Sequence, residues 1–176
     1  MVVFVTSNED KFKEFKKILD IDLRREDIDL EEIQAVEIDK VIKHKLSEAY
    51  ERLEEPVLVE DSGLFIEDWN RLPGALTKFF MSKLGYGEVC EMLGNERSAS
   101  AETYIGYKDE ENTKIFKGKT DGTIPKEPRG EGFGWDVIFI PEGYDRTFGE
   151  MDKREKNNIS MRKRALEKFV KWFENR

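Results

Sequence analysis

The chain has 176 residues, of which 38% are hydrophobic, so it can build a sizeable core as a single domain, or as two lobes that share one sheet. Its 38 acidic and 30 basic residues give a net charge of -8, which argues against binding to a nucleic acid, because that binding depends on Lys and Arg side chains that neutralise phosphates. A single cysteine, Cys90, excludes an internal disulfide, and no apolar run approaches about 18 residues, so we expect a cytoplasmic protein that does not enter a membrane.

The first half of the chain predicts strands and helices in alternation. Residues 2–5 are apolar and β-branched, which indicates a buried strand that runs into a polar loop. Residues 8–20 follow as an amphipathic helix with Asn8 placed to cap its start. A second amphipathic helix is expected at 37–53, and the run "PVLVEDSGLF" at 56–65 predicts the next strand.

The second half predicts a meander followed by a closing helix. Residues 81–94 favour a helix, and residues 100–109 and 113–124 favour two paired antiparallel strands. Residues 132–141 are typical of a glycine-broken loop that enters a buried strand, and residues 159–176 predict a final helix. Together with the first half, this order predicts an α/β fold, a mixed sheet flanked by helices.

The loop "TSNEDK", residues 6–11, is the first candidate binding segment. It places hydroxyls, an amide and a lysine between a strand and the N-terminus of a helix, where free N–H groups favour anions. The loop contains no glycine and is therefore not a Walker loop. Phosphate binding and a simple capped turn both remain open from these residues alone.

The second candidate is "VEDSG", where Glu60 and Asp61 follow an apolar run that we take to end there. Adjacent carboxylates that are partly desolvated need a nearby cation to stay ionised, and Mg²⁺ prefers such hard oxygen ligands. Because side chains alternate along a strand, the two can also point apart, one solvated and one capping a neighbour. A third carboxylate could come from any of four acidic residues, and their spacing in the sequence does not favour one of them. The four are Glu31, Glu32, Glu37 and Asp39.

The third candidate is "GFGWD", in which Phe133 and Trp135 could stack on a planar base with Asp136 as an acceptor. Core packing of the two aromatic side chains is the alternative interpretation. The only histidine, His44, lies on a predicted helix, so a Ser-His-Asp site or a multi-histidine metal site is disfavoured. The remaining carboxylate, Mg²⁺ and lysine chemistry matches phosphoryl transfer or hydrolysis.

Eight motifs in order resemble the inosine triphosphate pyrophosphatase family, which removes non-standard purine nucleoside triphosphates. The motifs are "TSNEDKFKEF", "EEIQ", "VEDSGLF", "LPGALTKFF", "FKGKTDGTI", "GFGWDVIFIPEG", "TFGEM" and "EKNNISMRKRAL". The similarity runs from residue 2 to about residue 170. The resemblance implies an elongated, two-lobed α/β fold with the active-site cleft between the lobes, and a homodimer.

The resemblance also implies roles for individual residues. Glu32, Glu60 and Asp61 would hold Mg²⁺, and Asp61 would also be the base for the attacking water, while Lys11 would offset charge that develops on the phosphates. The implied substrate-binding residues are Thr6, Ser7, Asn8, Lys11, Ser62, Lys78, Phe133, Gly134, Trp135, Asp136, Lys156, Met161 and Arg162, with Arg162 reading the 6-oxo group of the base.

Met161 departs from the family pattern, which usually has a histidine between this serine and arginine. Methionine has no N–H donor, so one hydrogen bond to the base would be lost and selectivity against ATP and GTP would weaken about tenfold at most. The expected activity is Mg²⁺-dependent hydrolysis of ITP, dITP or XTP to a monophosphate and pyrophosphate. The alternatives are a pyrophosphatase for pyrimidine or modified triphosphates and a nucleotide-binding protein without turnover.

Overall fold

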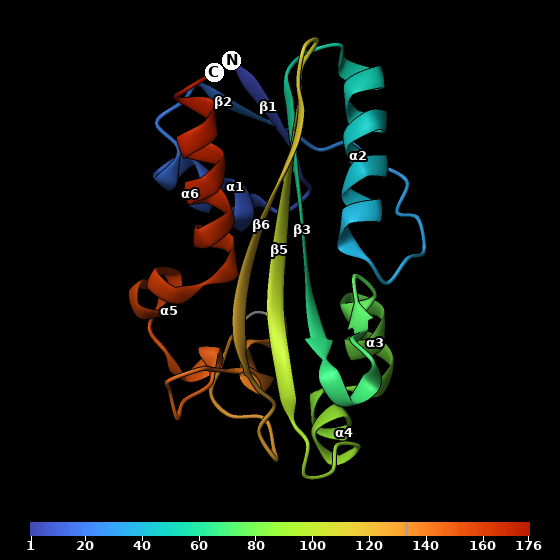
Figure 1. The fold of residues 1–176 in the computed structure, drawn as a ribbon, viewed down its shortest axis with the longest axis vertical. Helices are drawn as coiled ribbons and strands as arrows, with labels where there is room; N and C mark the ends of the chain where they lie inside the picture. Colours follow the sequence, from blue (N-terminus) through green and yellow to red (C-terminus); the bar gives the residue numbers. More distant parts are fainter. Residues whose placement is uncertain (133) are drawn as a thin grey trace.

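The strands form one mixed, seven-stranded sheet in a computed structural model that describes residues 1–132 and 134–176 (Figure 1). The sheet order is β2-β1-β3-β5-β6-β7, with β4 paired to β3. The strands are β1 (Val2–Val5), β2 (Leu23–Glu26), β3 (Val57–Ile66), β4 (Leu72–Gly74), β5 (Ser98–Lys108), β6 (Thr113–Thr123) and β7 (Ile140–Pro141). The predicted fold class, a mixed α/β sheet flanked by helices, is confirmed.

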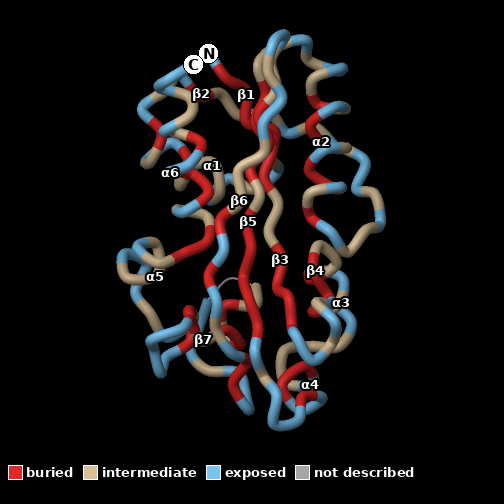
Figure 2. The backbone as a smooth tube through the Cα atoms, viewed as in Figure 1, coloured by how far each residue is buried: buried red, intermediate tan, exposed pale blue. Residues whose placement is uncertain are grey.

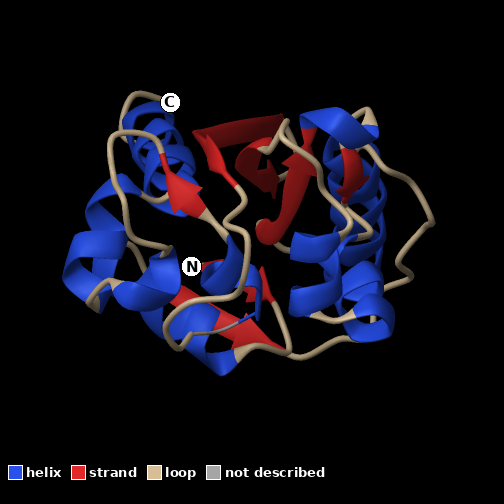
Figure 3. Ribbon diagram, turned by 90° about the horizontal axis from the view of Figure 1, so that it is seen from below, coloured by secondary structure: helices blue, strands red, loops and turns tan. Residues whose placement is uncertain are grey.

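Six α-helices and three short 3₁₀ helices accompany the described part of the sheet. They are α1 (Glu9–Ile18), α2 (Ile38–Leu53), α3 (Thr77–Leu84), α4 (Tyr86–Glu91), α5 (Lys153–Ile159), α6 (Met161–Phe173), η1 (Glu67–Trp69), η2 (Gly134–Ile138) and η3 (Phe148–Glu150). Seen along the sheet, the helices gather in two groups on either side of the strands (Figure 3). No described helix combines the length and the apolar character that a membrane crossing requires.

The alternation of side chains along β1 explains why both faces of the sheet are covered. Val2 and Phe4 pack with α1 and α6, whereas Val3 and Val5 pack with α2. All four side chains are buried, as the predicted strand required. The central strands are accordingly buried along much of their length (Figure 2). A third cluster, around Leu64 and Phe139, forms the core at the other end of the sheet.

The long strand β3 corrects the expectation that Glu60 and Asp61 stand at a strand end. Both lie inside β3, which pairs with β5 over its whole length and places Asp61 opposite Tyr104. Since β5 takes one edge of β3, β1 and β4 must share the other edge. The β1 ladder reaches Leu58 and the β4 ladder begins at Leu64, so the segment between them has no strand on this edge.

Two other predicted elements differ from the structure. In place of one helix at 81–94 the structure has α3 and α4, because Gly85, with a positive φ of +89°, interrupts the helical backbone between them. The predicted final helix is present as α6, which begins at Met161 because Ser160 is extended and caps α6 by accepting the N–H of Lys163, whereas the short helix α5 before it was not predicted. The buried strand expected within 132–141 is largely the 3₁₀ helix η2, followed by the two-residue β7. The edge strand β2 was not predicted.

Candidate active site

A cleft of about 1210 Å³ opens at the uncovered segment of β3. Its walls come from the first loop, the acidic loop before α2, β3, α3, η2 and the α5–α6 junction. Of the residues predicted for the site, the following line it: Thr6, Ser7, Asn8, Lys11, Glu32, Glu60, Asp61, Ser62, Lys78, Gly134, Trp135, Asp136, Lys156, Met161 and Arg162. Phe133 lies outside the described residues. Positions spread over the whole chain therefore meet in one cavity.

The first loop is held by its own side chains. Asn8 caps α1, because its side-chain oxygen accepts the N–H of Lys11 at 3.0 Å. The hydroxyl of Thr6 accepts the N–H of Asn8 at 3.1 Å. The capped turn expected from the sequence is thus present, and it directs Lys11 from the first turn of α1 toward β3. Capping and a role in anion binding are compatible in this loop.

Glu60 is fully buried and is surrounded by positive charge. Its Oε2 lies 2.6 Å from the Lys11 ammonium, and its Oε1 lies 3.3 Å from the Arg162 guanidinium. The hydroxyl of Ser62 donates to the same Oε1 at 2.6 Å. Burial alone would raise the pKa of Glu60, but Lys11 and Arg162 outweigh it and lower this pKa to about 2. Glu60 therefore carries a fixed negative charge.

Asp61 points to the opposite face of the sheet, as alternation along β3 requires. Its Oδ2 accepts a hydrogen bond from Lys45 at 3.2 Å, and its Oδ1 accepts the N–H of Ser62 at 2.8 Å. Burial raises the pKa of Asp61 and outweighs the opposing effect of Lys45. Lys45 also donates to Glu32 Oε1 at 2.6 Å, so one ammonium joins two carboxylates of the cleft.

Lys45 was missed in the sequence, although a signal for it exists. On α2 it lies between Val41 and Ala49 at a spacing of four residues, which puts it on the apolar face of the helix. A lysine on such a face must find buried partners. Burial lowers the pKa of Lys45, but Asp61 and Glu32 outweigh this effect, and the net shift is upward. The ammonium is therefore charged at neutral pH.

The predicted metal ligands come together only in part. Among the described residues, no three His, Cys, Asp or Glu side chains converge as a metal site would require. Glu32 and Asp61 do converge, because both bind the Lys45 ammonium, and their hard oxygens suit Mg²⁺ completed by phosphate oxygens and water. The carboxylate of Glu60 lies on the other face, engaged by Lys11 and Arg162. Glu32 and Asp61 are thus the two carboxylates that could hold such an ion together.

The other end of the cleft is aromatic and contains one ion pair. Trp135 lies half-buried, edge-on to Phe139 with the ring centres 5.9 Å apart. Asp136 is buried and binds the Lys156 ammonium at 2.5 Å. This end therefore presents an indole and a paired charge to whatever occupies the cleft.

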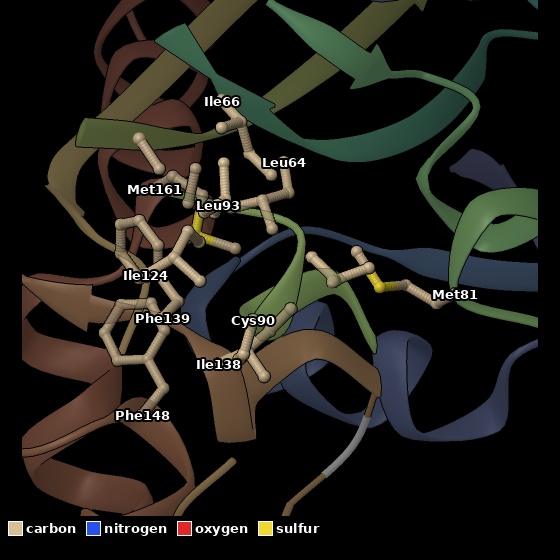
Figure 4. Close-up of a cluster of buried hydrophobic side chains, with 13 residues drawn as sticks. Leu64, Ile66, Met81, Cys90, Leu93, Ile124, Ile138, Phe139, Phe148 and Met161 are labelled. Carbon is tan, nitrogen blue, oxygen red and sulfur yellow. The ribbon is translucent and has the colours of Figure 1, made fainter. Parts of the chain in front are cut away.

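Met161 lies beside this end but belongs mostly to the core. Its side chain is buried in the cluster around Leu64 and Ile124 (Figure 4). The next residue, Arg162, binds Glu14 at 2.8 Å as well as Glu60, so two carboxylates hold its guanidinium. Both residues line the cleft; the Met161 side chain has no N–H or O–H donor, and the Arg162 guanidinium donates to carboxylates from Nε, Nη1 and Nη2.

Sequence relatives share nearly the full length of the chain. A dITP/XTP pyrophosphatase from Methanopyrus kandleri is 40% identical over 99% of this chain and 96% of the relative. An inosine triphosphate pyrophosphatase from Kluyveromyces lactis is 38% identical, again over 99% of this chain and 96% of the relative. The resemblance drawn from the eight motifs is therefore confirmed.

The fold and the family profile agree with these relatives. A solved structure of a HAM1 protein from Coxiella burnetii is 30% identical and superposes with a TM-score of 0.89, covering 99% of this chain and 98% of that one. The profile of the Ham1 family matches residues 2–172. Because this profile covers nearly the whole chain and the relatives match it over nearly their full length, the chain belongs to the Ham1 family.

Proposed function

We propose that this protein is a Mg²⁺-dependent pyrophosphohydrolase that converts ITP, dITP or XTP to the monophosphate and pyrophosphate. The observation that carries the proposal is one cleft with lysines and carboxylates at one end and Trp135 at the other. The charged end suits a triphosphate, and the indole suits a planar base. Two relatives are named for acting on dITP, XTP or inosine triphosphate, which supports the same substrate class.

The triphosphate would bind at the first loop and the neighbouring lysines. Thr6 and Ser7 offer hydroxyls beside the N-terminus of α1, where the helix dipole favours an anion. Lys11 lies in the first turn of α1, and Lys78 lines the same cleft from α3. Glu60 would act on the substrate indirectly, because its ion pair with Lys11 keeps that ammonium in the cleft.

Glu32 and Asp61 would hold Mg²⁺ together with phosphate oxygens of the substrate. When bound, the ion supplies positive charge to the phosphates and makes water more acidic. Lys45 binds both carboxylates and so keeps them directed to the same point. This assignment replaces Glu60 in the expected ligand set, because the Glu60 oxygens are engaged by Lys11 and Arg162.

Asp61 would accept the proton of the attacking water at Oδ2. The water oxygen forms a bond to the α-phosphorus, and the bond from that phosphorus to the bridging oxygen breaks, which releases pyrophosphate. The N–H of Ser62, 2.8 Å from Oδ1, fixes the carboxylate of Asp61 during this step. Lys11 and Lys78 would offset the charge that grows on the leaving pyrophosphate.

The base would stack on Trp135, with Lys156 donating to its 6-oxo group. Asp136 holds Lys156 in place through the ion pair at 2.5 Å. We assign the 6-oxo contact to Lys156 rather than to Arg162, because Lys156 is bound by one carboxylate and belongs to the Trp135 end of the cleft, whereas the Arg162 guanidinium is bound by both Glu14 and Glu60. Adenine carries an amino group where hypoxanthine carries this oxygen, so an ammonium donor disfavours ATP.

Pyrophosphate release is the test of this function. The purified protein is incubated with ITP, XTP, dITP, ATP, GTP and dTTP at equal concentrations with Mg²⁺, and an EDTA sample is the control. We expect release from ITP, XTP and dITP, loss of release with EDTA, and no turnover by an Asp61→Asn variant. Full turnover by that variant, or release that survives EDTA, contradicts the proposed mechanism.

The same panel distinguishes the alternative functions. Preference for dTTP would favour the pyrimidine alternative, and ITP binding without pyrophosphate release would favour a binding protein. We also propose, from the family resemblance, that the protein forms a homodimer, acts in the cytoplasm, and binds neither nucleic acid nor membrane. Light scattering at several concentrations tests the dimer, and a persistent mass near the 20.7 kDa of one chain contradicts it.

A further inference from the structure

The loop that carries Glu32 into the cleft spans residues 27–36 and forms neither helix nor strand. Its first six residues, 27–32, line the cleft. A loop without a backbone ladder needs other contacts to present a carboxylate at a fixed point, because a site must be held close to its working geometry. Hydrogen bonds to Asp29, Glu31 and Glu32 come from one side of α2, and at the far end of the loop the carbonyl oxygen of Val36 accepts the N–H of Ala75.

Glu48 and Arg52 of α2 bind backbone groups of this loop. The Oε2 atom of Glu48 accepts the N–H of Glu31 at 2.8 Å. The Nη1 atom of Arg52 donates to the carbonyl oxygen of Asp29 at 2.9 Å. Glu48 and Arg52 also form an ion pair with each other through Oε1 and Nη2. Two charged side chains therefore fasten the loop at two successive points.

These two residues continue a stripe that begins with Lys45. Lys45, Glu48 and Arg52 are separated by three and four positions, so they project from the same side of α2. Lys45 binds the side chain of Glu32, the residue directly after the backbone group held by Glu48. One helix side thus orients the carboxylate and the backbone that leads to it.

The contribution of this pair to global stability is small, because exposed ion pairs contribute little and the side chain of Arg52 is 48% exposed. Each side chain nevertheless makes a charge-assisted bond to the loop backbone, and such bonds are stronger than neutral ones. Their effect is therefore expected on the position of the loop more than on the unfolding of the protein.

We propose that Glu48 and Arg52 are positioning residues that hold the 27–32 loop so that Glu32 meets Asp61 at the Lys45 ammonium. Glu48 and Arg52 are assigned neither contact with the reacting atoms of the substrate nor a place among the Mg²⁺ ligands. The pair acts through the loop backbone, and its role in turnover rests on the function proposed above. We call the two contacts of Glu48 and Arg52 with the loop backbone the clamp, and their presence can be tested without measuring turnover.

Amide hydrogen exchange tests the clamp directly. In the Arg52→Met and Glu48→Ala variants, singly and combined, the amide of Glu31 and its neighbours in 28–33 should exchange about tenfold faster, because charge-assisted anchors are lost. Glu48→Gln keeps an acceptor oxygen and should restore part of the protection. Glu51→Ala, an exposed glutamate of the same helix, is the matched control and should leave this exchange unchanged.

Kinetics then test the positioning role. At saturating ITP, the double variant should need about five- to tenfold more Mg²⁺ for half-maximal turnover, while KM for ITP at saturating Mg²⁺ stays within about twofold. Melting temperatures are measured alongside, and either single variant carries the test if the double variant is unfolded. A general loss of structure would instead raise KM and lower turnover at every Mg²⁺ concentration.

The outcomes separate the clamp from the proposed function. Unchanged exchange in 28–33 overturns the clamp, and faster exchange with an unchanged Mg²⁺ requirement overturns the positioning role. If the wild-type protein releases no pyrophosphate, the proposed function fails and the positioning role fails with it. In that case faster exchange still supports the clamp as a structural contact.

Discussion

Glu60 and Asp61 are adjacent on β3, but they lie on opposite faces of the sheet and differ in their cationic partners and in the direction of their pKa shifts. On the face covered by α1 and α6, Glu60 meets both Lys11 and Arg162, and these cations lower its pKa to about 2. On the α2 face, Asp61 meets Lys45, and burial raises its pKa. On the same strand, Glu60 therefore binds two cations, whereas Asp61 shares the single cation Lys45 with Glu32.

The difference follows from where each cation comes from. Lys11 and Arg162 reach Glu60 from two separate helices, α1 and α6, so this ion pair network ties those helices to the sheet. Lys45 divides its charge between Asp61 and Glu32, which leaves carboxylate oxygens able to take a further cation. We infer that Glu60 serves mainly to organise the site and that the α2 face serves the chemistry.

The largest effect is expected when the cation shared by Glu32 and Asp61 is removed. Lys45→Met should lower kcat/KM for ITP about 1000-fold, because Glu32 and Asp61 would repel each other and lose their common orientation. Steady-state pyrophosphate release measures the effect. Lys43→Met, on the same helix but exposed and paired with Asp39, is the control and should remain near wild type. Comparable losses in both variants would contradict the special role of Lys45.

A second prediction compares the carboxylates themselves. Glu60→Gln should lower the free energy of unfolding by about 3 kcal/mol, because it leaves Lys11 and Arg162 against a buried neutral group. Asp61→Asn should cost less stability, since Lys45 keeps Glu32 as its partner. Denaturant titrations measure both values. A larger loss of stability in Asp61→Asn would reverse the assignment of the two faces.

A third carboxylate extends the comparison to pH. Glu102 of β5 is buried and binds Arg71 at 2.9 Å and Lys117 at 2.7 Å. It shares the face of Asp61, because Tyr104, two residues further along β5, lies opposite Asp61. Burial raises the pKa of Glu102, but the bonds to Lys117 and Arg71 outweigh it, and the net pKa is lowered.

The lowered pKa fixes the sign of the pH effect. The stability that ionised Glu102 contributes is present above the ordinary pKa of a glutamate and is lost as the pH falls through the lower folded value. At pH 7 the wild type should exceed Glu102→Gln by about 2 kcal/mol in unfolding free energy, and the gap should close toward pH 3. Glu110→Gln, at an exposed turn, is the control. A gap that persists at pH 3 would contradict the prediction.

The smallest effect concerns the outer end of the α6 face. Arg176 stacks over Phe173 at 3.8 Å and pairs with Asp109 at 3.0 Å, which joins the C-terminus to the β5–β6 turn. Arg176→Ala should lower the unfolding free energy by about 1 kcal/mol without changing turnover. Thermal melts and the ITP assay measure the two quantities, with Lys171→Ala on α6 as the control. A loss of turnover in Arg176→Ala would mean that this end of the face reaches the site.

The helices and strands with a regular apolar pattern could be predicted from local sequence. The amphipathic pattern of α1 and its Asn8 cap were predicted, as was the pairing of β5 with β6. The break at Gly85 was missed, because helical periodicity continues through this position, and the short helix α5 before Ser160 was not predicted. The strand β2 was missed because "LRRE" has no apolar alternation and gains its place by pairing with β1.

For the site, the residue types and, through eight ordered motifs, the positions that belong together could be predicted from the sequence. Alternation along a strand allowed Glu60 and Asp61 to point apart, but the sequence left that choice open. Which cation each carboxylate meets depends on how the chain folds, because Lys11, Lys45 and Arg162 come from helices far apart in the sequence. The uncovered edge of β3 that lets both faces reach one cleft is a property of the strand order, which no local pattern contains.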